Sequence, residues 1–271
     1  MGSRAALVKL VAGVLACALA PSLAVADEPH PCTAPTDVAR LAQPLTRTAQ
    51  RLARHEPLTI VAVGSSSTYG AGASSPAASY PSRLAVELKT LFPTESITVY
   101  NRGVNGEEVP DMLRRFADGV IKEKPDLVLW QVGTNSVLRD RPLGASSPLI
   151  LKGVAQLKAI DADVVMIDPQ YAPRVIAKAD AEGMVRLIAT TAKTADVDLI
   201  QRFAMMRWWH DHDHLDFADF VAPDNLHMND WGYACLAKQI SASLSEAATR
   251  NVMSASASVS AHATLTRGAA H

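Results

Sequence analysis

The feature that most constrains the fold of this chain is a regular alternation of short apolar runs with amphipathic segments between residues 58 and 248. The apolar runs have the length of buried strands, and several end at glycine or another turn-forming residue. This pattern predicts strands at residues 58–63, 97–100, 126–132, 164–167 and 197–200. The segments between and around them predict helices at residues 38–54, 79–91, 109–120, 147–157, 179–194 and 229–244.

Strands that alternate with helices indicate a parallel sheet of about five strands with helices on both of its faces. Parallel sheets of this kind bind their ligands at the carboxyl ends of the strands. We therefore expect an α/β domain over residues 58–248, preceded by an N-terminal segment with a helix over residues 27–57. Residues 249–271 are rich in alanine and serine without a core pattern, which predicts a disordered tail.

The first 26 residues have the layout of a signal peptide. Arg4 and Lys9 precede an apolar run over residues 10–20, and Ala24 and Ala26 offer a small-residue cleavage site. The run is short for a membrane span. The alternatives are an uncleaved anchor and a lipoprotein acylated on Cys17. Cleavage after Ala26 would export the protein to a periplasm or the exterior, with no stable membrane insertion of the mature chain.

Two cysteines remain after such a cleavage, Cys32 and Cys235. An exported pair can form a disulfide, but sequence spacing does not show whether the geometry permits it, and two unpaired thiols fit the sequence equally well. The chain has 26 Lys and Arg residues against 27 Asp and Glu residues. This balance supplies no broad basic field, so nucleic acid is not an expected partner. The oligomeric state stays open.

Four polar segments carry the residues of a serine hydrolase. A serine hydroxyl becomes a good nucleophile when a neighbouring imidazole accepts its proton, and a carboxylate then orients that imidazole. Preorganised N–H donors stabilise the oxyanion that develops. Three of the segments directly follow predicted strands, and the fourth precedes the last predicted helix. They span residues 64–70, 101–106, 133–136 and 224–227.

Each segment taken singly also has a structural explanation. The serine-rich turn can be only a turn, and Gly103 can be required only because glycine adopts backbone conformations that other residues do not. Asn135 can close a local turn. Asp224 can cap a helix, and His227 can be an ordinary buried histidine. All of them in this order at one edge of one sheet favour chemistry over these separate explanations.

In this order the segments resemble the conserved blocks of the SGNH (GDSL-type) esterase and lipase superfamily over nearly the whole mature domain. The resemblance implies that Ser66 is the nucleophile and that Asp224 and His227 complete a triad. It implies an oxyanion hole formed by the Ser66 amide, Gly103 and Asn135. It also implies a three-layer α/β/α fold with a flavodoxin-like parallel sheet. The sequence departs from the family pattern at Ser65, which stands where the family has aspartate.

The competing α/β-hydrolase fold fits less well. Its nucleophile elbow is Gly-x-Ser-x-Gly, and here Thr68 stands where the second glycine is required. The acid and the histidine of that fold also commonly come from separate loops rather than from positions three residues apart.

Two neighbouring features suggest further contacts. The run from His210 to His214 alternates histidine with aspartate, but it has no recognised zinc-ligand spacing, so a polar loop is expected and no metal or organic cofactor is expected. Aromatic side chains near a strand edge can stack on sugar rings or accept an acyl chain. Tyr171, Trp208 and Trp209 are candidates for substrate contact, with ordinary packing as the alternative.

The sequence therefore predicts an exported serine esterase that forms an acyl intermediate on Ser66. A small acyl group, such as acetate on an envelope or extracellular glycan, is the favoured substrate. Acyl transfer to a sugar hydroxyl and hydrolysis of a lysophospholipid or a thioester remain open. A non-catalytic glycan-binding module is the alternative from a different class of protein.

Overall fold

Five parallel strands form the centre of the structure, a computed structural model that describes Gly2 and residues 30–267. They are β1 (Leu58–Gly64), β2 (Ile97–Gly103), β3 (Leu127–Gln131), β4 (Asp163–Ile167) and β5 (Asp198–Ile200). Their order in the sheet is β2-β1-β3-β4-β5, and every neighbouring pair is parallel. The predicted α/β class is confirmed.

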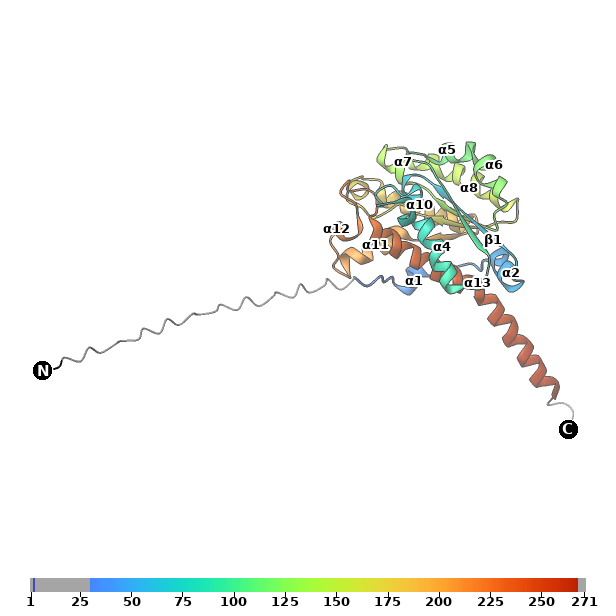
Figure 1. Cartoon of the computed structure of the whole chain (residues 1–271). Coiled ribbons are helices and arrows are strands. Elements are labelled where there is room, and N and C mark those ends of the chain that lie inside the picture. The colour runs from blue at the N-terminus through green and yellow to red at the C-terminus, as the bar shows by residue number, and fades with distance from the viewer. Residues whose placement is uncertain (1, 3–29, 268–271) are drawn as a thin grey trace. The chain divides into compact units, whose positions relative to one another are not determined.

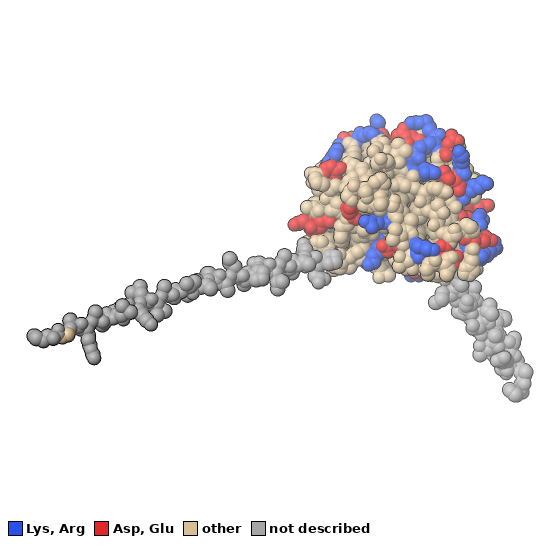
Figure 2. Space-filling view, in the orientation of Figure 1, with Lys and Arg blue, Asp and Glu red and all other residues tan. Residues whose placement is uncertain are grey.

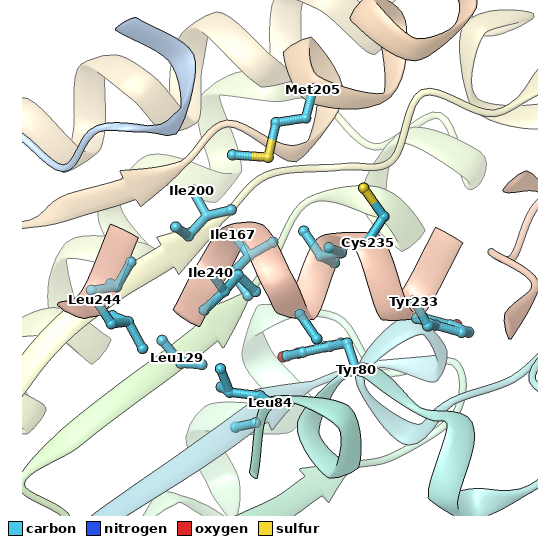
Figure 3. Packing of buried hydrophobic residues seen from close by; sticks show 14 of the residues in the cluster. Tyr80, Leu84, Leu129, Ile167, Ile200, Met205, Tyr233, Cys235, Ile240 and Leu244 are labelled. Carbon is cyan, nitrogen blue, oxygen red and sulfur yellow. The ribbon is translucent and has the colours of Figure 1, made fainter. Parts of the chain in front are cut away.

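Alternating side chains of the strands enter two separate cores, one on each face of the sheet. In β1, Ile60 and Ala62 belong to one core, whereas Val61 and Val63 belong to the other. The helices α4 (Tyr80–Leu91) and α13 (Asp230–Arg267) cover the first face, and their apolar side chains meet those of the strands (Figure 3). The opposite face is covered by α5 (Val109–Arg114), α8 (Ser146–Lys158) and α10 (Ala181–Thr194).

The three layers can be followed in Figure 1, where α5 and α8 lie across the sheet from α4 and α13. The remaining helices are mostly single turns in the connections. They are α1 (Thr36–Ala39), α2 (Thr46–Ala53), α3 (Ser66–Tyr69), α6 (Phe116–Gly119), α7 (Thr134–Leu138), α9 (Pro173–Ile176), α11 (Arg202–Asp211) and α12 (Phe217–Phe220), with 3-10 turns η1 (Pro76–Ala78), η2 (Ile121–Glu123) and η3 (Leu143–Ala145).

Two helices predicted as continuous are broken. The predicted helix over residues 38–54 is divided into α1 and α2, and Pro44 explains the break because proline lacks an N–H and disfavours helical conformation at the residue before it. The predicted helix over residues 109–120 is divided between α5 and α6 at Arg115. The guanidinium of Arg115 binds Glu107 and the carbonyl of Arg102.

Two other elements are longer than predicted. Strand β2 continues through Gly103, because its pairing with β1 extends in register to the Gly64–Gly103 pair although Asn101 and Arg102 are polar. Helix α13 continues to Arg267, whereas the sequence indicated a helix end at Leu244 and a disordered tail from residue 249. Alanine has the highest helix propensity, so an alanine-rich backbone can remain helical without an apolar stripe.

The predicted signal peptide lies outside the described residues, apart from Gly2. Within the part of the chain that the structure describes, none of the helices combines the length and the apolar character needed to cross a bilayer.

A disulfide joins Cys32 to Cys235, which resolves the pairing that the sequence left open. Cys235 is buried in α13, and Cys32 precedes α1, so the bond fastens the N-terminal segment to the last helix. The amide of Gln239 donates a hydrogen bond of 3.1 Å to the carbonyl of Cys32 and supports the same junction.

Replacing Cys32 with serine should lower the free energy of unfolding by about 2–5 kcal/mol, the usual effect of losing a disulfide that restrains the unfolded chain. Urea unfolding of the wild type and the variant, each with and without a thiol reductant, measures this change. The reductant should destabilise the wild type and leave Cys32→Ser unaffected. Equal stabilities of the two proteins without reductant would contradict the expectation.

Candidate active site

The turn that contains Ser66 follows strand β1 at the carboxyl edge of the sheet. Ser65 is buried, and its backbone N–H and its hydroxyl both donate to Oε1 of Gln131, each at 2.9 Å. Gln131 is the last residue of the neighbouring strand β3. The turn is thus fixed to the sheet immediately before Ser66, which begins the short helix α3 and is partly exposed.

Ser66, His227 and Asp224 form a continuous hydrogen-bonded chain. The Oγ of Ser66 lies 2.7 Å from Nε2 of His227, and Nδ1 of that imidazole lies 2.5 Å from Oδ2 of Asp224. The three residues that the sequence singled out for a triad are therefore brought together with the order of contacts that such a triad requires.

Asp224 is held in place by its own loop. Its Oδ1 accepts hydrogen bonds of 3.0 Å from the backbone N–H groups of Leu226 and His227. Burial raises the pKa of this carboxyl, but hydrogen bonds from the His227 side chain and from the two amides outweigh burial, and the net pKa is below its ordinary value. Asp224 therefore stays ionised at neutral pH and can stabilise a positive charge on the imidazole.

Asn135 comes from the turn after strand β3. Gly133 precedes it with φ +94°, a conformation that glycine adopts without strain, and a Cβ at that position would lie 2.7 Å from Cδ1 of Ile188. The side-chain amide of Asn135 donates one hydrogen bond of 2.8 Å to the carbonyl of Glu107. An asparagine amide carries two N–H donors, and the hydrogen bond to Glu107 uses one of them.

Gly103 comes from the end of strand β2 and packs directly beneath α3. A Cβ at Gly103 would lie 2.1 Å from the amide nitrogen of Tyr69, so only glycine fits there. Its backbone N–H donates to Oδ1 of Asn101 at 2.9 Å. The structure therefore shows a packing reason for this glycine, and its amide would have to share or release Asn101 to bind an oxyanion.

The three aromatic candidates differ in their surroundings. Trp209 is completely buried and donates from Nε1 to the carbonyl of Thr33 at 2.8 Å, so it belongs to the core and its assignment to substrate contact is wrong. Tyr171 is partly exposed and stacks against Phe217. Trp208 is also partly exposed, and its ring stacks on that of His212 with centroids 3.6 Å apart.

The histidine run is divided among separate partners. The Nδ1 of His212 lies 3.0 Å from Oδ1 of Asp213, whereas the ring of His210 packs on Phe217 and Tyr171. Among the side chains that the structure describes, no three from His, Cys, Asp or Glu gather in a way that could hold a metal ion.

Sequence reasoning missed several buried polar residues beneath the site: Gln131, Gln170 and Arg202. Gln131 ends strand β3, whose other four residues are all apolar, and this was a usable signal because a buried polar side chain requires a partner. Gln170 and Arg202 contact residues that are 32 or more positions away in the sequence, and no local sequence pattern predicts these contacts.

Comparisons with known proteins identify a family and a related esterase. The family model described as Non-GDSL lipase-like family matches residues 31–250. An acetylxylan esterase of Geobacillus stearothermophilus is 38% identical over 56 residues, a stretch that is 21% of this chain and only 26% of that protein.

Two solved structures show the same fold at low identity. A two-domain esterase active on acetylated mannans superposes with a TM-score of 0.65 and 19% identity, over 78% of this chain and 56% of its own. The acetylxylan esterase Axe2 of Geobacillus stearothermophilus superposes with a TM-score of 0.58 and 20% identity, over 69% of this chain and 94% of its own. Solved catalytic mutants of Axe2 replace a serine, a histidine or an aspartate with alanine.

Proposed function

The chain belongs to the Non-GDSL lipase-like family, and from that membership we propose that it hydrolyses carboxylic esters with Ser66 as its nucleophile. The observation that carries the proposal is the chain of contacts from Ser66 through His227 to Asp224, at 2.7 and 2.5 Å. A protein that only binds glycans would have no use for this alignment, which favours an enzyme over a binding module.

In this mechanism, Oγ of Ser66 attacks the ester carbonyl while Nε2 of His227 accepts the hydroxyl proton. The imidazolium that forms is stabilised by the carboxylate of Asp224. His227 then gives the proton to the departing alkoxide, so that an alcohol leaves and the acyl group stays on Ser66. Water, deprotonated by the same imidazole, releases the carboxylic acid and restores the serine. These steps use no metal or organic cofactor.

The oxyanion hole in this proposal contains the amide of Ser66 and the side chain of Asn135. The described residues provide no hydrogen-bond acceptor for the N–H of Ser66, and Asn135 has one N–H beyond the one given to Glu107. Gly103 would join them when its N–H leaves Asn101. Each well-placed donor of this kind typically contributes about 10²- to 10³-fold to the rate.

We also propose that the chain is an SGNH-type enzyme that departs from the GDSL pattern at one position. Ser65 replaces the aspartate of that pattern, and its hydroxyl is bound by Gln131. The substitution therefore changes how the loop before Ser66 is supported, while the nucleophile and its two partners are retained.

The proposed substrate is an O-acetyl group on an envelope or extracellular glycan. This choice is supported by the acetylated polysaccharides on which the similar esterases act, and by the partly exposed rings of Tyr171 and Trp208. Lys and Arg lie interspersed with Asp and Glu on the face seen in Figure 2. The proposed export agrees with a disulfide between Cys32 and Cys235, since such bonds persist in oxidising compartments.

Acetylated xylan and mannan oligosaccharides, together with nitrophenyl acetate and nitrophenyl octanoate, test the choice of substrate. The purified protein should release acetate from at least one oligosaccharide and should cleave the acetyl ester with a higher kcat/KM than the octanoyl ester. A higher kcat/KM for the octanoyl ester would contradict the proposed substrate and indicate a lipid esterase. Transfer of the acetyl group to an added sugar, in place of free acetate, would identify an acyltransferase.

A further inference from the structure

One buried glutamine lies among the three loops of the site. Gln170 follows strand β4 and is only 1% exposed. Its Oε1 accepts hydrogen bonds from Oγ1 of Thr134 at 2.9 Å and, more weakly, from Oγ of Ser67 at 3.4 Å. Its Nε2 donates to the carbonyl of Leu226 at 3.2 Å.

The three partners share one property, which is that each is the chain neighbour of a proposed site residue. Ser67 follows the nucleophile Ser66, Thr134 precedes the oxyanion donor Asn135, and Leu226 precedes the base His227. A single side-chain amide thus connects three segments that are far apart in the sequence.

The amide of Gln170 is itself held by the guanidinium of Arg202. Arg202 is fully buried, and its Nη2 donates to Oε1 of Gln170 at 2.9 Å while its Nε donates to the carbonyl of Asp168, also at 2.9 Å. Arginine can only donate hydrogen bonds, so it fixes which end of the glutamine amide is the oxygen. The nitrogen must then face Leu226, and the direction of the whole network is determined.

We propose that Gln170, oriented by Arg202, is a positioning residue. It sets the distances that separate Ser66, the Asn135 side chain and His227 from one another. This inference rests on the proposed ester hydrolysis. Its physical reason is that a nucleophile, its base and an oxyanion donor must be aligned within a fraction of an ångström, and that a displacement of about 1 Å caused by a remote substitution can lower the rate about 10²-fold.

The test compares Gln170→Met with Gln239→Met. Methionine matches the length of glutamine but offers none of its four hydrogen bonds, which join Gln170 to Ser67, Thr134, Arg202 and Leu226. Gln239 is a half-buried glutamine whose amide donates to Cys32 instead, so it is the matched control. We expect kcat for nitrophenyl acetate to fall about 10- to 100-fold in Gln170→Met, with KM within about twofold of the wild type. Gln239→Met should keep the wild-type kcat.

Stability and active-site titration separate positioning from loss of folded protein. Titration counts the molecules with a reactive serine, and kcat is expressed per reactive molecule. A Gln170→Met protein with wild-type kcat per reactive molecule would overturn the proposal, even if fewer molecules were folded. A lower kcat per reactive molecule, with the folded fraction confirmed by thermal unfolding, would support it.

Milder variants keep the proposal testable if Gln170→Met does not fold. Thr134→Val removes the 2.9 Å hydrogen bond to Gln170 and a longer one, of 3.5 Å, that Gln131 donates to the threonine hydroxyl. Thr191→Val removes the hydroxyl of an equally buried threonine that bonds to Leu187 on α10 and to Ser147. The first should lower kcat and the second should not, whereas equal kcat values would overturn the proposal. The wild type must first show esterase activity that Ser66→Ala abolishes. If the wild type has no such activity, the result refutes the proposed function rather than the role of Gln170.

Discussion

Ester turnover should fall about 10⁴- to 10⁶-fold when Ser66 is replaced by alanine, while the protein stays folded. Alanine removes the only atom of this residue that can form the acyl bond. The hydroxyl is partly exposed and makes its hydrogen bond to His227 alone among the described contacts, so little packing is lost. Initial rates with nitrophenyl acetate and thermal unfolding curves measure the two effects together.

Ser75→Ala is the matched control for this variant. Ser75 is an exposed serine in the loop after α3 and lies outside the network of the site. Its replacement should change neither kcat nor the unfolding temperature. Near-wild-type turnover by purified Ser66→Ala would remove Ser66 as the nucleophile, and with it the proposed acyl intermediate.

The second large effect is expected for Asp224→Asn, at about 10⁴-fold in kcat, the loss that this substitution causes in another serine hydrolase. The amide preserves the shape of the side chain but removes the negative charge that stabilises the imidazolium of His227. It can also present an N–H to Nδ1 of His227 and so select the wrong tautomer. The backbone bonds to Leu226 and His227 need only an oxygen acceptor, so thermal stability should change little.

Asn225→Gly is the control for the same loop. Asn225 has φ +58°, which glycine adopts freely, whereas alanine would add strain. This variant should keep kcat within a few-fold of the wild type. An Asp224→Asn protein with normal kcat but a lower unfolding temperature would make Asp224 a structural residue of the loop.

The protonation of Asp224 gives these measurements a pH dependence. The pKa of its carboxyl is lowered in the folded protein, so the stabilisation from its hydrogen bonds is present above the ordinary aspartate range and is lost as the pH falls through the lowered value. Thermal unfolding measured over a series of pH values should therefore show that this stabilisation persists into mildly acidic solution.

Most of the fold could be predicted because strand and helix periodicities are local. The runs that became β1, β3 and β4 were found within a few residues of their ends, since they are buried on both faces and almost wholly apolar. Strand β2 was underestimated because its final residues are polar and owe their extended form to pairing with β1. The pairing of one strand with another cannot be predicted from the local sequence.

In the candidate site, too, local motifs could be predicted from the sequence and spatial contacts could not. Ser66, Asp224 and His227 could be selected because they stand in short motifs after predicted strands or before a helix. Their proximity is a finding of the structure, and their chemical roles stay predictions. Trp209 was misassigned because two adjacent tryptophans on a helix face different directions, one partly exposed and one in the core.

The bond between Cys32 and Cys235 makes the catalytic part of the chain a closed loop of covalent bonds. All the proposed site residues, from Ser66 to His227, lie between the two cysteines. A protease that cuts one exposed turn within this span would therefore leave both fragments attached to each other. Under the proposed export, a single cut by an extracellular protease would therefore not separate Ser66 from Asp224 and His227.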